Sequence, residues 1–454
     1  MDLNENIFRE YDIRGVVAED FQKDIVESLG KAFGTYIIKK GWKTISVSGD
    51  IRETSIELKD NFINGLLTTG VNVIDIGIIP TPTNYFSMYF LNTDAAVQIT
   101  GSHNPPEFNG FKFSCKKESF YGQKIQELKK LIQNKKYIKG NGTLKTKNII
   151  NDYIGMLESK IKINKKMKII IDCGNACGCL TAPETLRRIG VEVKELYCNV
   201  DSTFPNHHPD PTVDSNLNDI ISEIKKGNFD LGIAFDGDAD RIVAIDEDGK
   251  IIRSDNLIAL FLPEIITKEN KKIIFDVKCS EALEEMIAYY GGEPLMWKTG
   301  HSLIKDKMKQ EKVTFAGEMS GHIFFADDYY GFDDALYVGL RLLQLLSNTN
   351  KKLSELTNQI PKYYSTPEMR LNCKNDNEKF EITNKAIEYF KKKHKCITID
   401  GVRIKFKNGW GLVRSSNTQP VIVCRFEAEN PKKLEEIKYY VLNKLNEFGE
   451  ISYE

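Results

Sequence analysis

The sequence predicts a multidomain α/β protein in which three similar α/β units with mixed sheets are followed by a smaller α+β domain. Over residues 1–361, short apolar runs alternate with longer runs whose apolar residues follow the helical period, as in proteins built from strands and helices in turn. After Pro361 apolar and polar residues alternate, as in a half-exposed antiparallel sheet. The 454 residues also exceed what one ordinary hydrophobic core organises.

The first three units share one pattern, a short apolar strand that runs into a glycine-containing polar loop. We expect these strands at 95–99, 231–235 and 313–316. Ligand sites in α/β sheets lie beyond the carboxyl ends of parallel strands. The three loops are therefore expected to face one place, as in a weak internal repeat.

The expected elements follow in chain order. The first unit has a helix over 21–40, a strand over 44–47, a helix over 56–67, a strand over 71–76, and a lysine-rich solvated helix and linker over 124–147. The second has strands over 167–171, 191–196, 229–235 and 242–245, a helix over 182–189 and a loop over 199–216. The third has a strand over 271–276 and a helix over 281–290, and the fourth has strands over 401–407, 411–414 and 421–428 and a helix over 431–448. The predicted domains are 1–147, 148–249, 250–361 and 362–454.

Composition narrows the class of partner. The 63 Lys and Arg residues nearly balance the 64 Asp and Glu residues, so no overall field favours nucleic acid or an acidic membrane. No apolar stretch reaches the ~18 residues of a membrane span, and the first residues do not resemble a leader peptide. We expect a cytoplasmic protein, a monomer or weak homo-oligomer, with a small-molecule ligand. The cluster Cys173, Cys177 and Cys179 is interpreted as crowded turn residues rather than a zinc site, because no fourth ligand follows at zinc spacing.

The loop 100–112 is the first candidate site. Its prolines and glycines indicate a rigid turn that presents Ser102, and Lys112 supplies a cation nearby. On an extended backbone Ser102 and His103 would point to opposite sides, and the Gly-x-Ser-x-Gly elbow is absent. A Ser-His hydrolase is therefore disfavoured.

The second candidate site is the run Asp236-Gly-Asp-Ala-Asp-Arg241. Alternating carboxylates on an extended segment face one side, and three of them repel unless a cation neutralises them, which indicates a Mg²⁺ site at Asp236, Asp238 and Asp240. A calcium loop with Glu247 at its twelfth position is the alternative. It is disfavoured because Arg241 replaces the turn glycine and the flanks are predicted as strands.

Two further loops carry polar groups. The stretch 414–420 offers a guanidinium, hydroxyls and backbone N–H groups that suit a phosphate, although the same residues fit a plain polar turn. The stretch 317–322 offers a carboxylate, a hydroxyl and an imidazole that suit a polyhydroxylated ligand, although a simple hairpin turn explains it equally well.

Taken together, four ordered stretches resemble the signature loops of the α-D-phosphohexomutases, and most closely the bacterial phosphomannomutase/phosphoglucomutase branch. They are Thr100-Gly-Ser-His-Asn-Pro105, Asp236-Gly-Asp-Ala-Asp-Arg241, Gly317-Glu-Met-Ser-Gly-His322 and Arg414-Ser-Ser-Asn-Thr418. The likeness also covers Phe8-Arg-Glu-Tyr-Asp-Ile-Arg-Gly15 and Trp297-Lys-Thr-Gly-His-Ser-Leu-Ile304, and so runs along the whole chain.

The resemblance implies four domains around a central cleft, each giving one loop. Ser102 would carry a phosphoryl group, and one Mg²⁺ would be held by Asp236, Asp238, Asp240 and a phosphate oxygen of that serine. Arg14, Lys112 and Arg241 would neutralise developing charge, and Lys112 and His301 are the candidates for acid–base work. The substrate would contact Tyr11, His103, Lys278, Glu318, Met319, Ser320, Gly321, His322, Arg414, Ser415, Ser416, Asn417 and Thr418.

The implied reaction interconverts hexose 1-phosphate and hexose 6-phosphate, of mannose or glucose, through a hexose 1,6-bisphosphate that also serves as activator. A phosphoglucosamine mutase is the nearest alternative, disfavoured by Met319 and by the Ser416-Asn417-Thr418 loop. A sugar-phosphate binding protein without catalysis is the alternative from another class. It predicts a lost nucleophile or metal ligand, whereas Ser102 and all three aspartates are present.

Overall fold

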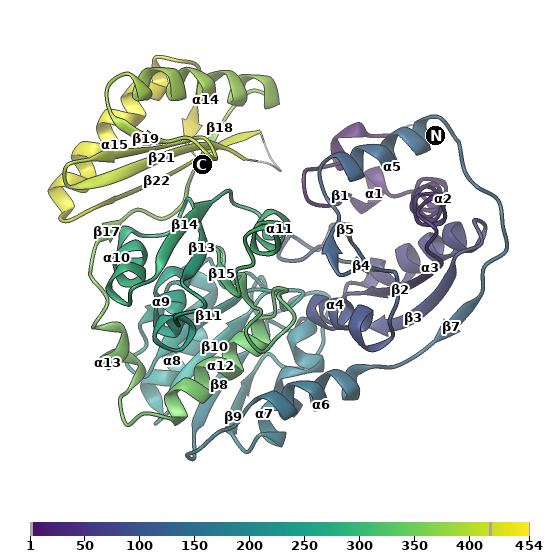
Figure 1. Cartoon of the computed structure of the whole chain (residues 1–454), viewed down its shortest axis with the longest axis horizontal. Coiled ribbons are helices and arrows are strands. Elements are labelled where there is room, and N and C mark those ends of the chain that lie inside the picture. The colour runs from purple at the N-terminus through teal and green to yellow at the C-terminus, as the bar shows by residue number, and fades with distance from the viewer. Residues whose placement is uncertain (1–2, 417–419, 454) are drawn as a thin grey trace.

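The computed structural model describes residues 3–416 and 420–453, arranged as four α/β units. Figure 1 shows the first unit as a lobe of its own, while the second, third and fourth units follow one another in a column beside it. Asn417 and Thr418, two of the predicted substrate contacts, lie outside the described residues. No helix within the described ranges is long and apolar enough to cross a membrane.

The first unit is a mixed sheet with helices on it. Its strand order is β1 (Ile13–Val16), β5 (Phe108–Cys115), β4 (Ala95–Ile99), β2 (Thr44–Gly49), β3 (Asn72–Ile78) and β7 (Leu144–Thr146), with β6 (Glu118–Ser119) paired to β5. The central strands β4, β2 and β3 are parallel, and β5 is antiparallel to β4 and β1. The helical elements are η1 (Glu5–Ile7), α1 (Val17–Asp20), α2 (Lys23–Lys39), α3 (Glu53–Leu67), α4 (Thr81–Phe90) and α5 (Gln123–Gln133).

Two expectations for this unit were wrong. The stretch 124–147 begins with the expected helix, but α5 buries Ile125, Leu128 and Ile132 against the first unit, and within the expected linker residues 144–146 add strand β7 to the sheet. The many lysines masked an apolar stripe at helical spacing. The loop 100–112 is also shorter than expected, since β5 begins at Phe108 and Lys112 lies on that strand opposite Gln98.

The second unit has the strand order β12 (Ile251–Ile252), β11 (Ile242–Asp246), β10 (Leu231–Phe235), β8 (Lys168–Asp172) and β9 (Glu192–Leu196). Strands β10, β8 and β9 are parallel, and β11 turns back antiparallel to β10. The helical elements are α6 (Ile150–Lys160), η2 (Cys177–Leu180), α7 (Ala182–Arg188), η3 (Asp214–Leu217) and α8 (Asn218–Lys226). The return strand places the turn 236–241 at the carboxyl end of β10.

The third unit repeats this plan with the order β14 (Glu293–Trp297), β13 (Lys272–Asp276), β15 (Phe315–Gly317) and β16 (Ile323–Phe325). Its helices are α9 (Ser254–Ile265), α10 (Glu281–Tyr289), α11 (His301–Glu311), α12 (Ala335–Ser347) and α13 (Leu353–Thr357). Helix α12 packs against β10 and β11 of the second unit. One hydrophobic cluster therefore runs through both units, with Ile233 and Phe235 from one and Phe315 from the other.

The fourth unit is an antiparallel sheet in the order β19 (Lys395–Ile397), β20 (Val402–Phe406), β21 (Gly409–Ser415), β22 (Val421–Ala428), β18 (Met369–Asn372) and β23 (Ser452–Tyr453), with β17 (Tyr364–Ser365) paired to β22. Helices α14 (Asp376–Lys391) and α15 (Pro431–Asn446) cover one face of the sheet (Figure 1). Asn430 caps α15 by accepting from the Lys433 N–H, and Pro431 follows at the first turn. This unit has a core of its own.

Candidate active site

Ser102 lies in a turn that is held from behind by a buried ion pair. Its φ of 51° is left-handed, and its backbone N–H donates to Thr100 Oγ1 at 2.8 Å. Arg52 pairs with Asp50 and donates to the carbonyl oxygens of Ser102, Asn104, Pro105 and Phe108. The loop is thus rigid, as its composition predicts, and Ser102 is only 2% exposed.

The turn also changes the relation between Ser102 and His103. Because Ser102 adopts a left-handed rather than an extended conformation, its Oγ lies 3.2 Å from His103 Nδ1. The expectation that the two side chains point apart was wrong for this reason. Burial and the nearby Arg241 charge hold the pKa of His103 well below its usual range, so the ring is neutral at pH 7.

The three aspartates meet at a tight turn rather than on an extended segment. Asp236 Oδ1 accepts the backbone N–H groups of Asp240 and Arg241, and Ala239 has a φ of 59°. The carboxylate oxygens of Asp236, Asp238 and Asp240 lie within 4.8 Å of one another, and all three side chains are fully buried. The predicted convergence of these ligands is present, but the turn produces it instead of the strand alternation.

This cluster fits a divalent cation. Asp238 Oδ1 and Asp240 Oδ1 are buried and have no hydrogen-bond partner within the described residues. Burial, together with the charges of Asp240 and Asp238, raises the pKa of Asp236 well above its usual value. Such mutual repulsion is relieved when a cation lies between the carboxylates, and oxygen ligands suit Mg²⁺.

Lys112 joins the serine strand to this cluster. Its Nζ lies 2.7 Å from Asp238 Oδ2 and 2.6 Å from Asp240 Oδ2, and its side chain is 6% exposed. Burial opposes the charged form of Asp238, but the Lys112 charge outweighs burial and lowers the pKa of that carboxyl. Ser102 Oγ donates to Asp236 Oδ2 at 3.3 Å, so the loops of the first and second units meet at the serine.

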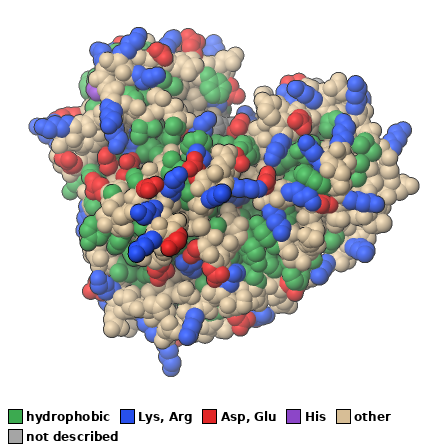
Figure 2. Space-filling model, in the orientation of Figure 1, with side chains coloured by type: hydrophobic (Ala, Val, Ile, Leu, Met, Phe, Trp, Pro, Cys, Tyr) green, Lys and Arg blue, Asp and Glu red, His purple; other side chains and the backbone are tan. Residues whose placement is uncertain are grey.

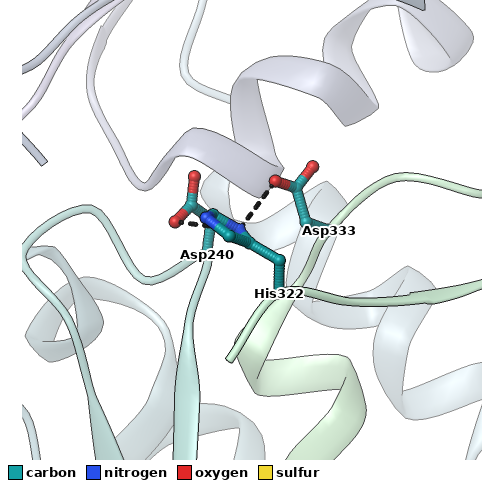
Figure 3. Close-up of side chains that lie close together, drawn as sticks. All are labelled: Asp240, His322 and Asp333. Carbon is teal, nitrogen blue, oxygen red and sulfur yellow. Dashed lines mark ion pairs between the residues drawn. The ribbon is translucent and has the colours of Figure 1, made fainter. Parts of the chain in front are cut away.

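A chain of imidazoles and carboxylates extends from the aspartates into the third unit, as Figure 3 shows for its central part. His322 Nδ1 lies 3.6 Å from Asp240 Oδ1 and 3.0 Å from Asp333 Oδ2. His301 Nδ1 lies 3.3 Å from the same Asp333 oxygen. Burial and the Lys305 charge lower the pKa of His301 to about 4, although Asp333 opposes the shift. His301 is therefore neutral at pH 7 and able to accept a proton.

Arg241 bridges the second and third units. Its Nε lies 2.9 Å from His322 Nε2 and 3.9 Å from Asp236 Oδ2. Gly321 beside it has a φ of 99°, and a Cβ there would approach the Ile242 carbonyl oxygen at 2.9 Å. The loop 317–322 is therefore pressed against strand β11, which aims His322 toward the metal loop.

Glu318 lies at the start of the same loop. It is 1% exposed and accepts the Gly300 backbone N–H through Oε1. Burial raises the pKa of Glu318 to about 7, although the His322 charge opposes this. Met319 donates its backbone N–H to Asp276 Oδ1, and Ser320 is partly exposed. The loop thus offers a buried carboxyl and an accessible hydroxyl.

Tyr11 and Arg14 bring the N-terminal segment to this place. Tyr11 Oη donates to the Thr299 carbonyl oxygen at 2.6 Å, and its ring lies 6.3 Å from that of His301. Arg14 pairs with Asp12 at 2.6 Å and donates to Asn104 Oδ1 in the serine loop.

Lys278 and Arg414 form a second group of cations where the third and fourth units meet. Lys278 Nζ lies 3.1 Å from Glu368 Oε2, and Arg414 Nε donates to Asp400 Oδ2 at 3.0 Å. Asp400 also accepts the Thr299 backbone N–H, so the segment that receives Tyr11 also reaches the fourth unit. Arg414 Nη2 has no hydrogen-bond partner within the described residues.

Ser415 and Ser416 are placed differently from each other. Ser415 Oγ interacts with Thr383 Oγ1 of α14 and with the Lys379 carbonyl oxygen, so it faces the helix layer. Ser416 is 7% exposed and donates its backbone N–H to the Val421 carbonyl oxygen. Ser416 therefore pairs with the first residue of β22, next to the end of β21 at Ser415.

Several residues of this site were missed from the sequence. Asp50 and Arg52 hold the serine loop, Thr81 Oγ1 donates to Asp238 Oδ2, and Asp333 binds two imidazoles. None of them stands in the four loops, and a lone aspartate or arginine in sequence resembles a surface residue. The adjacent pair Asp333-Asp334 was a signal that could have been used, because it directly precedes an apolar helix. Acidic residues are seldom buried without a partner, so two of them at such a position indicate a functional or ion-paired site.

Two structural alternatives are excluded. Strands β10 and β11, rather than helices, flank the turn 236–241, so the calcium-loop interpretation is wrong. Cys173 and Cys177 are buried at the turn after β8, and Cys173 lies against Cys198. Among the described residues, the clusters of possible metal ligands contain no cysteine.

Comparison with known protein families shows that four family models match the chain along nearly its whole length. Family models of phosphoglucomutase/phosphomannomutase match the chain in order: alpha/beta/alpha domain I over 5–139, domain II over 151–249, domain III over 253–364 and the C-terminal domain over 368–444.

Full-length relatives agree with these models. The phosphomannomutase/phosphoglucomutase of Pseudomonas aeruginosa is 41% identical over 449 residues, which are 98% of this chain and 96% of that protein. A phosphoglucomutase of Neisseria meningitidis is 40% identical over 95% of each chain. The crystal structure of a phosphoglucomutase/phosphomannomutase family protein from Burkholderia thailandensis superposes with a TM-score of 0.93 at 38% identity, covering 99% of this chain and 100% of that one. The chain therefore belongs to the phosphoglucomutase/phosphomannomutase family, and thus to the α-D-phosphohexomutase enzymes.

Proposed function

We propose that this protein interconverts hexose 1-phosphates and hexose 6-phosphates of glucose, mannose or both, through a phosphorylated Ser102. One observation carries the proposal: Ser102 Oγ contacts Asp236 in a cluster of three buried carboxylates, and Lys112, Arg241 and His103 lie around the same place. Phosphoryl transfer needs positioning and charge neutralisation more than covalent chemistry, and this arrangement supplies both. The names of the relatives point the same way.

The charges around Ser102 have separate tasks. Asp236, Asp238 and Asp240 would hold Mg²⁺ with an oxygen of the phosphoserine, and the ion would neutralise charge on the transferring phosphoryl group. Lys112 lies beside the same carboxylates and supplies a fixed positive charge. Arg14 and Arg241 flank the serine loop and place guanidinium groups for the phosphoryl oxygens.

A neutral side chain near the sugar hydroxyl would accept the proton that this hydroxyl loses during phosphoryl transfer. His301 is neutral at pH 7 and rests against Asp333, which orients the ring and stabilises it when a proton arrives. Lys112 is the second candidate. Its ion pairs with Asp238 and Asp240 raise the pKa of its ammonium, which favours an electrostatic task over proton transfer.

The group at Lys278 and Arg414 would hold the phosphate that does not react. Arg414 Nη2 is an unused buried donor, and Glu318 and Ser320 would hold sugar hydroxyls between the two phosphate sites. A hexose 1,6-bisphosphate reversed between the two ends would present either phosphate to Ser102. Three further assignments stay proposals. Other substrate contacts are assigned to Tyr11, His103, Met319, Gly321, His322, Ser415, Ser416, Asn417 and Thr418. The domain limits are 1–147, 148–249, 250–361 and 362–454, and the protein is taken to be a cytoplasmic monomer or weak oligomer with free cysteines.

The test is a coupled assay with Mg²⁺, a trace of glucose 1,6-bisphosphate, and glucose 1-phosphate, mannose 1-phosphate or glucosamine 1-phosphate in parallel. Turnover of the first two, lost in Ser102→Ala, supports the proposal and gives the sugar preference. Intact-mass measurement after incubation with the bisphosphate adds a second readout, one phosphoryl group on the wild type and none on the variant. Turnover of glucosamine 1-phosphate alone contradicts the assigned substrate, and tight phosphosugar binding without turnover supports the binding protein instead.

A further inference from the structure

A cavity of about 540 Å³ lies between the first and third units. Its walls come from α4, the β5–β6 turn, α11 and the segment 326–332. The volume falls within the ~300–1,000 Å³ that is usual for small-molecule sites. None of the side chains assigned above to Mg²⁺, phosphate or sugar lines it, so the cavity is separate from the Ser102 site.

The cavity is rich in positive charge. Its lining includes five lysines but only two carboxylates, Glu118 and Asp306. Lys309 pairs with Glu118, but neither Lys117 nor Lys312 has an ion pair anywhere in the described ranges. Figure 2 shows basic side chains gathered on this face, over α11 and across the junction with the first unit. Unpaired lysines at a concave surface attract phosphate groups.

The apolar part of the lining is aromatic. Tyr89 and Tyr330 have ring centroids 4.3 Å apart, and the ring of Phe332 lies nearly parallel to that of Tyr330 at 5.7 Å. Lys117 Nζ lies 4.5 Å from the centre of the Tyr89 ring, so a cation and an aromatic ring are presented together. Flat aromatic ligands stack on such side chains, and the bases of nucleic acids bind proteins in this way.

We propose that this cavity binds a nucleoside phosphate, with the base against Tyr89 and Tyr330 and the phosphates at Lys117 and Lys312. A hexose phosphate does not match this lining, because a sugar ring offers no flat π face to the aromatic side chains of the wall. The proposal does not depend on the mutase activity, since no residue of the Ser102 site takes part.

Lys305 is left unchanged in the test. It lines the cavity and lies 4.2 Å from the Tyr85 ring centre, but its Nζ also pairs with Asp333 at 2.8 Å. Because Asp333 orients His301 and His322, a change at Lys305 would disturb the Ser102 site as well.

The experiment is a fluorescence titration of the full-length protein with a fluorescently labelled ATP at fixed Mg²⁺, displaced in turn by ATP, UTP, adenosine and pyrophosphate. We expect the labelled ATP to bind saturably. ATP or UTP should displace it more strongly than adenosine, which lacks the phosphates, or pyrophosphate, which lacks the base. Displacement by pyrophosphate as strong as by ATP would overturn the proposal, since the aromatic wall would then contribute nothing. Absence of saturable binding would also overturn it.

The location is tested with the double variant Lys117→Glu/Lys312→Glu. We expect its affinity for labelled ATP to fall by at least about tenfold, because two attractive charges become repulsive. Both lysines have positive φ, so Lys117→Asn/Lys312→Asn is the second variant, which keeps a residue type that tolerates this backbone while removing the charge.

The matched control is Lys139→Glu/Lys268→Glu, which makes the same change of net charge at two exposed lysines outside the cavity, again one in each unit. Binding retained in the control and weakened in both cavity variants supports the proposal. Equal weakening in control and cavity variants would mean general attraction of anions, and unchanged binding in the cavity variants would place the nucleotide elsewhere; either result overturns it.

Discussion

The centre formed by Ser102 and the three aspartates and the cation group of Lys278 and Arg414 are supported by different parts of the core. The second and third units share one hydrophobic cluster, which also takes in Tyr85 and Phe86 of the first unit, so the loops 236–241 and 317–322 rest on one continuous core. Strands β4 and β5, which carry the Ser102 loop, pack in the core of the first unit. The fourth unit has its own core and meets the third through a small hydrophobic cluster, Val277 with Trp410 and Leu412, and through polar contacts. Arg403, for example, donates to the carbonyl oxygens of Val277 and Cys279.

This difference suits the two tasks. Close packing in a shared core keeps reacting groups in fixed positions, whereas a small interface between separate cores permits a unit to shift. The contact of the fourth unit with the first fits this account, because Arg9 and Asp376 lie 3.8 Å apart and are partly exposed. We expect the fourth unit to close over a bound ligand, which would keep water from a phosphoserine.

The strongest challenge to the rigid centre is Asp238→Asn. Lys112 would lose one of two carboxylates and the metal cluster one of three, so we expect kcat to fall on the order of 10²–10³-fold. Steady-state assays over a range of Mg²⁺ concentrations check this. Asp248→Asn, in the exposed turn after β11, is the control and is expected to leave kcat unchanged. Near-normal kcat in Asp238→Asn would show that the cluster does not serve the reaction.

The support behind the serine loop is tested by Arg52→Met. This change leaves Asp50 buried without its ion-pair partner and removes the Arg52 hydrogen bonds to four loop carbonyls, so we expect the free energy of unfolding to fall by about 3 kcal/mol. Chemical denaturation measures it. Arg9→Met, at the partly exposed contact with the fourth unit, is expected to change stability by less than about 1 kcal/mol. Equal effects of the two variants would remove the contrast between the centre and the fourth-unit interface.

In the cation group of Lys278 and Arg414, the variant Arg414→Lys tests whether Arg414 serves substrate binding or the chemical step. A lysine keeps the charge but loses the planar fork, and so cannot both pair with Asp400 and bind two phosphate oxygens. We expect KM for the hexose phosphate to rise about tenfold with a smaller change in kcat. Initial-rate kinetics distinguish the two. A fall in kcat with unchanged KM would place Arg414 at the reacting phosphate instead.

The smallest effect is expected from the titration of Glu318. Its carboxyl is protonated below about pH 7 in the folded protein but ionises near 4.5 when unfolded, so its contribution to stability is present at low pH and is lost as pH rises through 7. If the carboxylate accepts sugar hydroxyls, KM falls a few-fold between pH 6 and 8, because charged acceptors bind hydroxyls more strongly.

The comparison for Glu318 is Glu318→Gln, measured over the same pH range. Substrate phosphate also titrates near pH 6, but it does so in both proteins, so the difference between the two KM profiles reports Glu318 alone. Parallel profiles would exclude this carboxyl as the source. Thermal unfolding of the two proteins from pH 5 to 8 gives the stability side of the same titration.

The sequence by itself determined the fold class, the antiparallel character of the fourth unit and the four loops that carry the site. These are local properties, because apolar period, glycine and proline placement and runs of carboxylates are all visible within a few residues. Ser102 and the three aspartates could be selected for this reason. Strand β7 and the buried face of helix α5 could not, since the lysine-rich composition of 124–147 outweighed a stripe of three apolar residues.

Only the tertiary structure decided which distant residues complete the site and how the loops turn. The left-handed backbone at Ser102 depends on Arg52, fifty positions earlier, and the orientation of His301 and His322 depends on Asp333. Such contacts are set by how sheets pack and where strands end, and a single side chain in sequence carries no trace of them. The shared core of the second and third units is of the same kind, because it exists only after α12 packs across both sheets.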